Sequence, residues 1–329
     1  MTRILNIDEN SLKQAKSIIL NGGAVAFPTE TVYGLGANAL DTSAVNRIFE
    51  IKGRPNDNPL IVHVHKEFDI GELVEDIPDY SKKLAQKYLP GPLTMVYKSK
   101  GKVSSAVSCG LGTLAIRIPS HEGAQEFLKY VGIPVAAPSA NISKHVSPTS
   151  ARHVFADLEG KIEIILDGGE CKGGIESTVL DCTGNIPVIL RSGLITREMI
   201  EKTVGACGEY VYSEDGIARS PGMKYKHYSP KCRTALFDFS EYTKALELYD
   251  EESKRGEKVC ILCDNSMAKL IGGRMFLNLG STPEEMAANL YSKLREGEAC
   301  ARLLIAIAPK TRGGVMDGVM NRLTKACRN

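Results

Sequence analysis

The chain has 329 residues, which is enough for two domains that each bury a core of their own. Its 41 lysines and arginines nearly balance 39 aspartates and glutamates, so the composition lacks the basic excess typical of a dedicated nucleic-acid binder. The amino-terminal segment lacks the basic stretch followed by an apolar stretch that is typical of a signal peptide. No apolar run is long enough to span a bilayer, so we expect a soluble, cytoplasmic protein without membrane contact.

Residues 1–205 mix predicted helices and strands without strict alternation. SLKQAKSIIL has apolar residues at helical spacing and ends at Asn21-Gly22, which predicts the first helix. Short β-branched runs bounded by Gly, Pro or Asp predict strands, among them AVAF, LIVHV, LTMVYK, LAIRIP and STVLD. Further helices are predicted at about 43–52, 80–89, 121–131, 149–158 and 196–204. The pattern favours an α/β domain with a large mixed sheet.

Residues 233–329 have a more regular pattern, in which four strand–helix units follow one another. This predicts a small Rossmann-like α/β domain with a parallel sheet. Residues 206–232 lie between the two domains and contain SPGMKYKHYSPK, Ser220 to Lys231. Three lysines, two tyrosines and a histidine are unusual in a passive tether, so this linker is a candidate for a functional role.

The nine cysteines are an odd number and lack the dense, regular spacing of a secreted disulfide framework, so we expect free thiols. Cys260 and Cys263 have CxxC spacing, but they lie in an apolar run that reads as a buried strand. Core packing is the expected role of this pair, and metal or redox use is the alternative.

The common nucleotide-binding and hydrolase motifs are absent. No GxxxxGK[ST], GxSxG or HExxH occurs. Gly34–Ala39 and Gly110–Ala115 both match GxGxxA, but neither follows a strand and opens a helix as the dinucleotide-binding fingerprint requires. Hydride transfer, P-loop chemistry and zinc hydrolysis therefore lose their main support.

Polar clusters instead follow the predicted strands of the first domain, where α/β proteins build ligand pockets. They supply cations, hydroxyls and amides but few candidate nucleophiles. Taken alone, PTET and SPTS favour ordinary turn and helix-cap chemistry, with ligand binding as the alternative. The clusters are PTETVYGLG (28–36), KGRPNDNPLIVHV (52–64), TLAIRIPSH (113–121), APSANIS (137–143), SPTS (147–150), GGIESTV (173–179) and LRSG (190–193).

Three side chains in these clusters indicate anion binding most directly. Lys52 and Arg54 flank Gly53, which a turn does not require and which suits triphosphate oxygens. Arg117 lies within the strand LAIRIP, where an unpaired guanidinium is costly, so it meets either a carboxylate of the protein or one of a ligand. His63, inside LIVHV, taken by itself favours a satisfied core histidine over a ligand-binding one.

Taken together and in order, PTETVYGLG, KGRP, LAIRIP, PSAN, ESTV and LRSG, with SPGMKYKHYSP as linker, resemble the YrdC-like threonylcarbamoyl-AMP synthases in their long two-domain form. The resemblance implies a nucleotidyltransferase, L-threonylcarbamoyladenylate synthase. Such an enzyme makes threonylcarbamoyl-adenylate and pyrophosphate from L-threonine, bicarbonate or carbon dioxide, and ATP. The product serves threonylcarbamoylation of the adenosine next to the anticodon of tRNA.

The resemblance also implies roles for individual residues. Lys52 and Arg54 would be the catalytic cations on the ATP phosphates. The remaining ATP-binding residues would be Asn58, Thr113, Ser139, Asn141, Ser147 and Arg191, with Tyr225 and His227 from the linker. L-threonine would be held by Thr31, His63, Arg117 and Ser177. Mg²⁺ is expected on the ATP phosphates rather than on protein side chains, and no organic cofactor is expected.

The linker, 206–232, is interpreted as a lid that folds across the mouth of the first domain, because carbamoyl-adenylate hydrolyses readily and gains from exclusion of water. Passive packing between the domains is the alternative. An RNA-binding module and a carbamoyltransferase domain of the kind found in hydrogenase maturation factors are the rival functions. Contact with tRNA and with downstream threonylcarbamoyl-transfer enzymes stays open.

The second domain carries only one candidate site, PKTRGGVMDG (309–318), where Gly313-Gly314 precedes a predicted helix that could receive an anion. A solvated helix start is the reading we favour for this segment, and anion binding is the alternative. We expect this domain to support the linker or to dock downstream enzymes.

Overall fold

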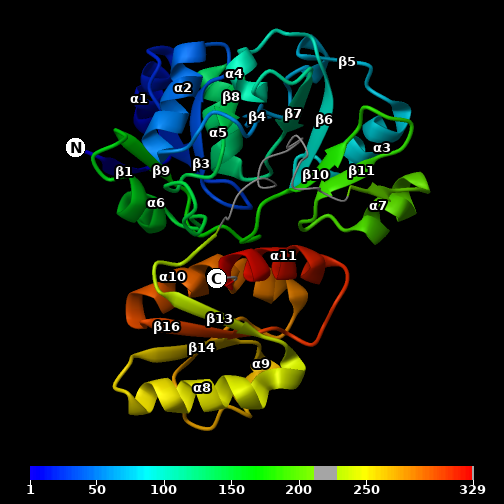
Figure 1. Ribbon diagram of the computed structural model, residues 1–329. Helices are drawn as coiled ribbons and strands as arrows, with labels where there is room; N and C mark the ends of the chain where they lie inside the picture. The colour runs from blue at the N-terminus through cyan, green and yellow to red at the C-terminus, as the bar shows by residue number, and fades with distance from the viewer. Residues whose placement is uncertain (211–227, 328–329) are drawn as a thin grey trace.

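The computed structural model describes residues 1–210 and 228–327. The first part of the chain forms one twelve-stranded mixed sheet in the order β1-β9-β2-β3-β8-β4-β7-β6-β10-β11-β12, with β5 paired to β6 (Figure 1). Its strands are β1 (Arg3–Asn6), β2 (Val25–Phe27), β3 (Gly34–Asn38), β4 (Ile61–His63), β5 (Val74–Glu75), β6 (Leu93–Ser99), β7 (Thr113–Arg117), β8 (Val135–Ala137), β9 (Ile164–Asp167), β10 (Thr178–Asp181), β11 (Val188–Arg191) and β12 (Gly208–Glu209).

The helices of this domain divide between the two faces of the sheet. Side chains of α1 and α5 pack on β2, β8 and β9, and side chains of α2, α3 and α6 pack on the opposite face. Alternation along β8 shows the division, since Val135 belongs to the first core and Ala136 to the second. The helices are α1 (Glu9–Leu20), α2 (Thr42–Lys52), α3 (Asp79–Tyr88), α4 (Ser105–Ser108), α5 (Glu122–Val131), α6 (Ala151–Leu158) and α7 (Arg197–Val204), with a 3₁₀ turn at Ile70–Glu72.

One region of the first face is built differently. Over β4, β7, β6, β10 and β11, the buried apolar cluster contains only strand residues, with Tyr210 packed at its edge, in the part of the chain that the structure describes. Ile61, Ala115 and Val96 belong to this cluster. Ile61, at one end of the cluster, also lines the cavity described below.

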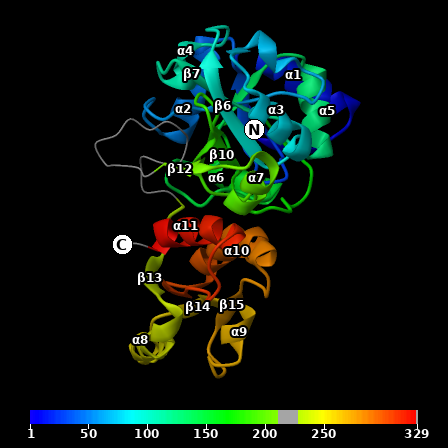
Figure 2. The ribbon, with the colours of Figure 1, turned by 90° about the vertical axis from the view of Figure 1, so that its right-hand side faces the viewer.

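The second domain is a four-stranded, wholly parallel sheet in the order β13-β16-β14-β15. Helices α8 and α9 pack on one face, and α10 and α11 pack on the other. Figures 1 and 2 show α10 and α11 between this sheet and the first domain. Its elements are β13 (Arg233–Phe237), α8 (Tyr242–Lys254), β14 (Val259–Cys263), α9 (Asn265–Ala268), β15 (Phe276–Asn278), α10 (Pro283–Cys300), β16 (Leu303–Ile307) and α11 (Val315–Cys327), with a 3₁₀ turn at Phe239–Glu241.

The predicted fold class is confirmed: a mixed-sheet α/β domain precedes a small parallel α/β domain. Sequence patterns missed β1, β3 and the two-residue strands β5 and β12, and Gly34–Asn38 proved to be a strand antiparallel to β2 and β8. Cys260 and Cys263 are buried in β14, where burial raises the pKa of each thiol to about 12, as core packing predicts. None of the helices within 1–210 and 228–327 combines the length and apolarity needed to cross a membrane.

Candidate active site

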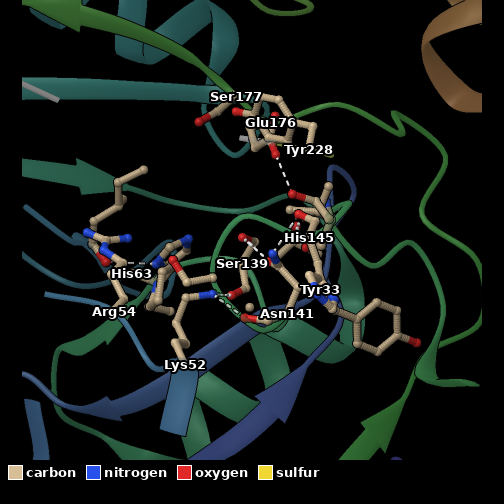
Figure 3. A pocket seen from close by; sticks show the side chains of 18 of the residues that line it. Tyr33, Lys52, Arg54, His63, Ser139, Asn141, His145, Glu176, Ser177 and Tyr228 are labelled. Atoms are coloured by element: carbon tan, nitrogen blue, oxygen red, sulfur yellow. Dashed lines mark hydrogen bonds between the residues drawn. The ribbon is translucent and has the colours of Figure 1, made fainter. Parts of the chain in front are cut away.

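A cavity lies over the strand ends of β4, β7 and β8 and is closed on one side by the loops that follow β8 and precede β10. Figure 3 shows Lys52, His63 and Ser139 on its walls together with Glu176, Ser177 and Tyr228. Residues that the sequence separates widely are therefore gathered around one concave surface.

Strand register places several of these side chains in a row. His63 lies opposite Arg117 on β7, Arg117 lies opposite Thr94 on β6, and Thr94 lies opposite Val179 on β10, which in turn lies opposite Arg191. Directly opposed residues in a sheet project from the same face. The row extends along the part of the sheet that carries the cavity.

Arg117 is buried and forms an ion pair with Glu30, with 2.7 Å between Nη2 and Oε1. The second carboxylate oxygen of Glu30 accepts a hydrogen bond from the backbone N–H of Ser120 at 3.0 Å. Nε of Arg117 is buried and has no hydrogen-bond partner among the described residues. A protein carboxylate thus fixes one edge of the guanidinium, and donor capacity remains for a ligand.

His63 is a neutral side chain in this environment. Burial and the nearby charge of Arg117 lower the pKa of His63 to about 3, and Nδ1 lies 3.1 Å from the carbonyl oxygen of Ile61. A neutral imidazole whose Nδ1–H donates to a carbonyl has Nε2 available as an acceptor. The ring is therefore suited to orienting a donor and is a poor proton acceptor in catalysis.

Lys52 ends α2 and is anchored by the loop after β8. Its Nζ donates to the carbonyl oxygens of Ser139 and Asn141 at 2.5 and 2.6 Å. Burial, with the charge of Arg54 second, lowers the pKa of Lys52 well below its ordinary value. Arg54 follows the left-handed Gly53 that terminates α2, lies over the ring of Phe49 and donates to the carbonyl of Asn58. An anion between the two cations would restore the charge of Lys52.

The opposite wall centres on Glu176. Its Oε1 accepts from the hydroxyl of Ser147 at 2.7 Å, while Oε2 accepts from Tyr291 at 2.8 Å and from Nε of Arg322 at 3.1 Å. Burial alone would raise the pKa of Glu176, but its arginine and hydroxyl neighbours outweigh burial and hold the pKa at about 2. Glu176 is therefore an ionised carboxylate inside the protein.

The structure brings most predicted site residues to this cavity. Those that line it are Lys52, Arg54, His63, Arg117, Ser139, Asn141, Ser147, Ser177 and Arg191. Arg191 donates to the carbonyl of Ser177 from Nε at 3.1 Å and from Nη2 at 2.9 Å. Tyr225 and His227 lie outside the described residues, so the lid contacts predicted for them remain predictions.

Three predicted residues are not part of the lining. Thr31 is buried behind Thr29, with 2.9 Å between their hydroxyl oxygens. Asn58 is buried under Arg54, and its side-chain amide has no partner among the described residues. Thr113 begins β7, on the same face as Arg117 but at the other end of the strand.

Sequence reasoning missed seven polar or charged residues that line the cavity: Thr29, Tyr33, Ser143, Lys144, His145, Glu176 and Tyr228. Glu176 lies inside the cluster GGIESTV, in which the resemblance assigns a role only to Ser177. Its partners Tyr291 and Arg322 lie in the second domain, and no local pattern connects them to it. Among the residues described, no group of three or more His, Cys, Asp or Glu side chains is placed to hold a metal ion.

The chain is similar over nearly its whole length to proteins of one family. A family model described as "Telomere recombination" matches residues 17–193, and one described as "Threonylcarbamoyl-AMP synthase, C-terminal domain" matches residues 195–327. A Pyrococcus abyssi protein named threonylcarbamoyl-AMP synthase is 43% identical over 336 residues, which cover 99% of this chain and 98% of that protein. The chain belongs to the threonylcarbamoyl-AMP synthase family. This membership confirms the resemblance, the enzyme class and the function predicted from sequence, threonylcarbamoyl-AMP synthesis for tRNA modification.

Other family members agree over the full length. A Bacillus subtilis threonylcarbamoyl-AMP synthase is 40% identical over 337 residues, covering 99% of this chain and 95% of that protein. The solved structure of P. abyssi Sua5 complexed with L-threonine is 42% identical and superposes with a TM-score of 0.91, covering 99% of this chain and 98% of that one. Escherichia coli YciO is 23% identical with a TM-score of 0.53 and covers 59% of this chain, which shows a shared fold only.

Proposed function

We propose that this synthase binds ATP and L-threonine in the single cavity described above and joins them through a threonine carbamate. The observation that carries the proposal is the distribution of cations: Lys52 and Arg54 line the same cavity as Arg117. Two anions can therefore be held against one another by fixed positive charge.

L-threonine is assigned to the row formed by His63 and Arg117. The guanidinium, held by Glu30, offers its remaining donors to the threonine carboxylate. Nε2 of the neutral His63 can accept from the threonine amine or hydroxyl. A relative solved in complex with L-threonine supports a threonine site in this fold. Ser177 completes the site, and Thr31 supports it from behind Thr29.

ATP is assigned to the other walls. Lys52 and Arg54 face the phosphates, and the loop residues Ser139, Asn141 and Ser147 face the nucleoside, with Arg191 beside them. Mg²⁺ enters with the triphosphate as part of the substrate, held by phosphate oxygens and water. The only carboxylate that lines the described cavity, Glu176, is already shared among Ser147, Tyr291 and Arg322.

The chemistry needs no protein nucleophile. The threonine amine attacks carbon dioxide, loses a proton and becomes a carbamate; bicarbonate would reach the same species with loss of water. A carbamate oxygen then attacks the α-phosphorus as the bond to the bridging oxygen of the β-phosphate breaks, and pyrophosphate leaves. Lys52 and Arg54 stabilise the charge that develops on the phosphates, and the protein's task is positioning and exclusion of water.

The linker, 206–232, is proposed as the lid over this reaction, between a catalytic domain of residues 1–205 and a second domain of residues 233–329. Tyr228, the first linker residue of the described stretch 228–327, lines the cavity and is buried, which supports the assignment. Limited proteolysis near Lys224 tests it, because substrates should protect a lid. Cleavage that is indifferent to ATP and threonine would favour passive packing.

Pyrophosphate release by the purified protein tests the proposed reaction. Release should require ATP, threonine and bicarbonate together and should stop when any one is left out. An RNA-binding module would instead bind RNA with steep salt dependence and no response to threonine. A threonine-independent release of pyrophosphate would contradict the proposal.

A further inference from the structure

We propose that two residues of the second domain, Tyr291 and Arg322, are positioning residues for the nucleotide site and act through Glu176 on the hydroxyl of Ser147. The inference rests on the proposed function, because Ser147 is assigned there to ATP. It gives the second domain a direct part in building the active site, beyond support for the linker.

The first step concerns the proton of Ser147. Glu176 is an ionised carboxylate and can only accept, so all three of its side-chain partners donate to it. The single hydroxyl proton of Ser147 is thereby committed to Glu176, and its lone pairs remain for the cavity. A phosphate at neutral pH offers them no proton, whereas a ribose hydroxyl or the adenine amine does. The network assigns Ser147 to the nucleoside part of ATP.

The second step concerns what fixes Glu176. Tyr291 on α10 and Arg322 on α11 are both fully buried, and both reach across the domain boundary to Oε2. Arg322 also donates to the carbonyl of Ser192, next to Arg191. A buried carboxylate that loses such partners carries an uncompensated charge and rearranges or becomes protonated. A protonated Glu176 can itself donate a hydrogen bond, so the hydroxyl of Ser147 would no longer have to be the donor.

A second buried arginine holds the same segment from its other side. Nη2 of Arg295, on α10, donates to the carbonyl of Val146 at 2.5 Å and lies 2.7 Å from Oδ2 of Asp157 on α6. Arg295 thus binds the carbonyl of Val146, the residue before Ser147. Arg322 binds Glu176, which in turn accepts from the hydroxyl of Ser147. Both contacts come from the second domain.

The domain boundary itself is closely packed, so these contacts have little freedom. A Cβ atom on Gly174 would lie 2.3 Å from the carbonyl oxygen of Ala287, and one on Gly318 would lie 3.0 Å from Ile175 and 3.3 Å from Cα of Gly193. The backbone of the first domain around Gly174 and Gly193 therefore contacts α10 and α11 directly, close to the point where Glu176 binds residues of the second domain. A shift of either helix would be transmitted to the cavity wall.

The same network reaches the linker. The rings of Tyr228 and Tyr291 stack with centroids 5.3 Å apart. Figure 3 shows Tyr228 at the cavity, which it lines. Tyr291 therefore contacts the linker with its ring and Glu176 with its hydroxyl. Because Phe keeps the ring, Tyr291→Phe retains the stacking on Tyr228 and removes the contacts of the hydroxyl with Glu176 and with Tyr228.

A double-mutant cycle tests the proposal in the full-length protein. The KM values for ATP and for threonine are measured by pyrophosphate release in Tyr291→Phe, Ser147→Ala and the double variant. Tyr291→Phe should raise the ATP KM about fivefold, the range of one buried hydrogen bond, and leave the threonine KM unchanged. In the Ser147→Ala background it should have no further effect, because the hydroxyl on which it acts is gone.

Two further variants frame this cycle. Arg322→Met should raise the ATP KM more than Tyr291→Phe does, because it leaves a buried charge without its ion partner. Arg274→Met is the control, since it breaks an ion pair of the second domain, with Asp250 at 2.6 Å, that belongs to neither the cavity nor the Glu176 network. It should leave both KM values unchanged. If Arg322→Met does not fold, the Tyr291–Ser147 cycle decides alone.

ATP analogues that lack one ribose hydroxyl or the adenine amine identify the donor that Ser147 receives. One of these analogues should bind the wild type less tightly than ATP does. In Ser147→Ala, that analogue and ATP should bind with the same affinity. Independent, multiplying effects of Tyr291→Phe and Ser147→Ala would overturn the proposal, as would equal rises in both KM values. A wild type that releases no pyrophosphate would refute the proposed function itself, which keeps the two failures apart.

Discussion

The buried Arg117 and the partly buried Glu30 form an ion pair with 2.7 Å between Nη2 and Oε1. The sequence allowed either a protein carboxylate or a ligand carboxylate as the partner of this mid-strand arginine. The structure shows a protein carboxylate as the partner. Nε of Arg117 has no hydrogen-bond partner among the described residues, so it can also bind a ligand carboxylate. Glu30 thus orients the guanidinium that we assign to threonine.

Replacement of Arg117 should separate the two substrates. Arg117→Ala removes charge-assisted hydrogen bonds worth about 1.5–3 kcal/mol, so the threonine KM should rise roughly tenfold to a hundredfold, with a much smaller change for ATP. Arg117→Lys keeps the charge but not the fork and should recover only part of the loss. Steady-state kinetics with each substrate varied checks this. Equal losses for ATP and threonine would contradict the assignment.

Lys52 should take up a proton when ATP binds. Burial lowers its pKa in the free protein, and the triphosphate favours the charged form, so the pKa rises in the complex. Calorimetric titration in buffers of different ionisation enthalpy should therefore show proton uptake at neutral to alkaline pH. The uptake should disappear in Lys52→Met. Uptake that persists in this variant would point to another group.

His63 should make folding stability depend on acid pH. Its folded-state pKa of about 3 lies below the ordinary value of 6.5, so the unfolded chain binds more protons between these values. The contribution of neutral His63 is fully present above pH 6.5 and is lost as the pH falls toward 3, with a slope approaching about 1.4 kcal/mol per pH unit. Denaturant unfolding of His63→Gln across this range should show a shallower decline. An unchanged slope would refute the buried, neutral state.

Gly174 should prove irreplaceable for a steric reason. Its φ of +70° resembles the +75° of Gly160, but a Cβ on Gly174 would strike Ala287 and Ala288 of α10, whereas one on Gly160 meets nothing within 4 Å. Gly160→Ala is therefore a matched control for backbone strain, expected at about 1 kcal/mol. Gly174→Ala should cost clearly more and raise the ATP KM. Thermal unfolding and kinetics compare the two; equal losses would mean that the domain contact is loose.

Much of the fold was predictable because its elements carry local signals. The helices 80–89 and 121–131 were expected within a residue or two of α3 and α5, since amphipathic spacing is a local signal and the left-handed Gly132 ends α5. The strand Gly34–Asn38 was not predicted, because its glycines match no strand pattern. The structure supplies the reason: a Cβ on Gly36 would lie 2.7 Å from Val135 on the neighbouring strand β8.

The candidate site was predictable only in part. Motifs identified Lys52, Arg54 and Arg117 because cations in turns and strands are unusual there. The row from His63 to Arg191 depends on strand register, which the sequence does not state. The links from Glu176 to Tyr291 and Arg322 join residues of two domains, and periodicity cannot reveal such a pairing.

A crystal structure of the protein with L-threonine and a non-hydrolysable ATP analogue tests the central claim most directly. We predict the threonine carboxylate on Arg117, the phosphates between Lys52 and Arg54, and the amine of threonine facing the α-phosphate. The cleft between the domains, lined by Lys172, Glu284 and Gly313, provides the alternative location. Threonine or nucleotide bound in that cleft, apart from its co-substrate, would contradict the account.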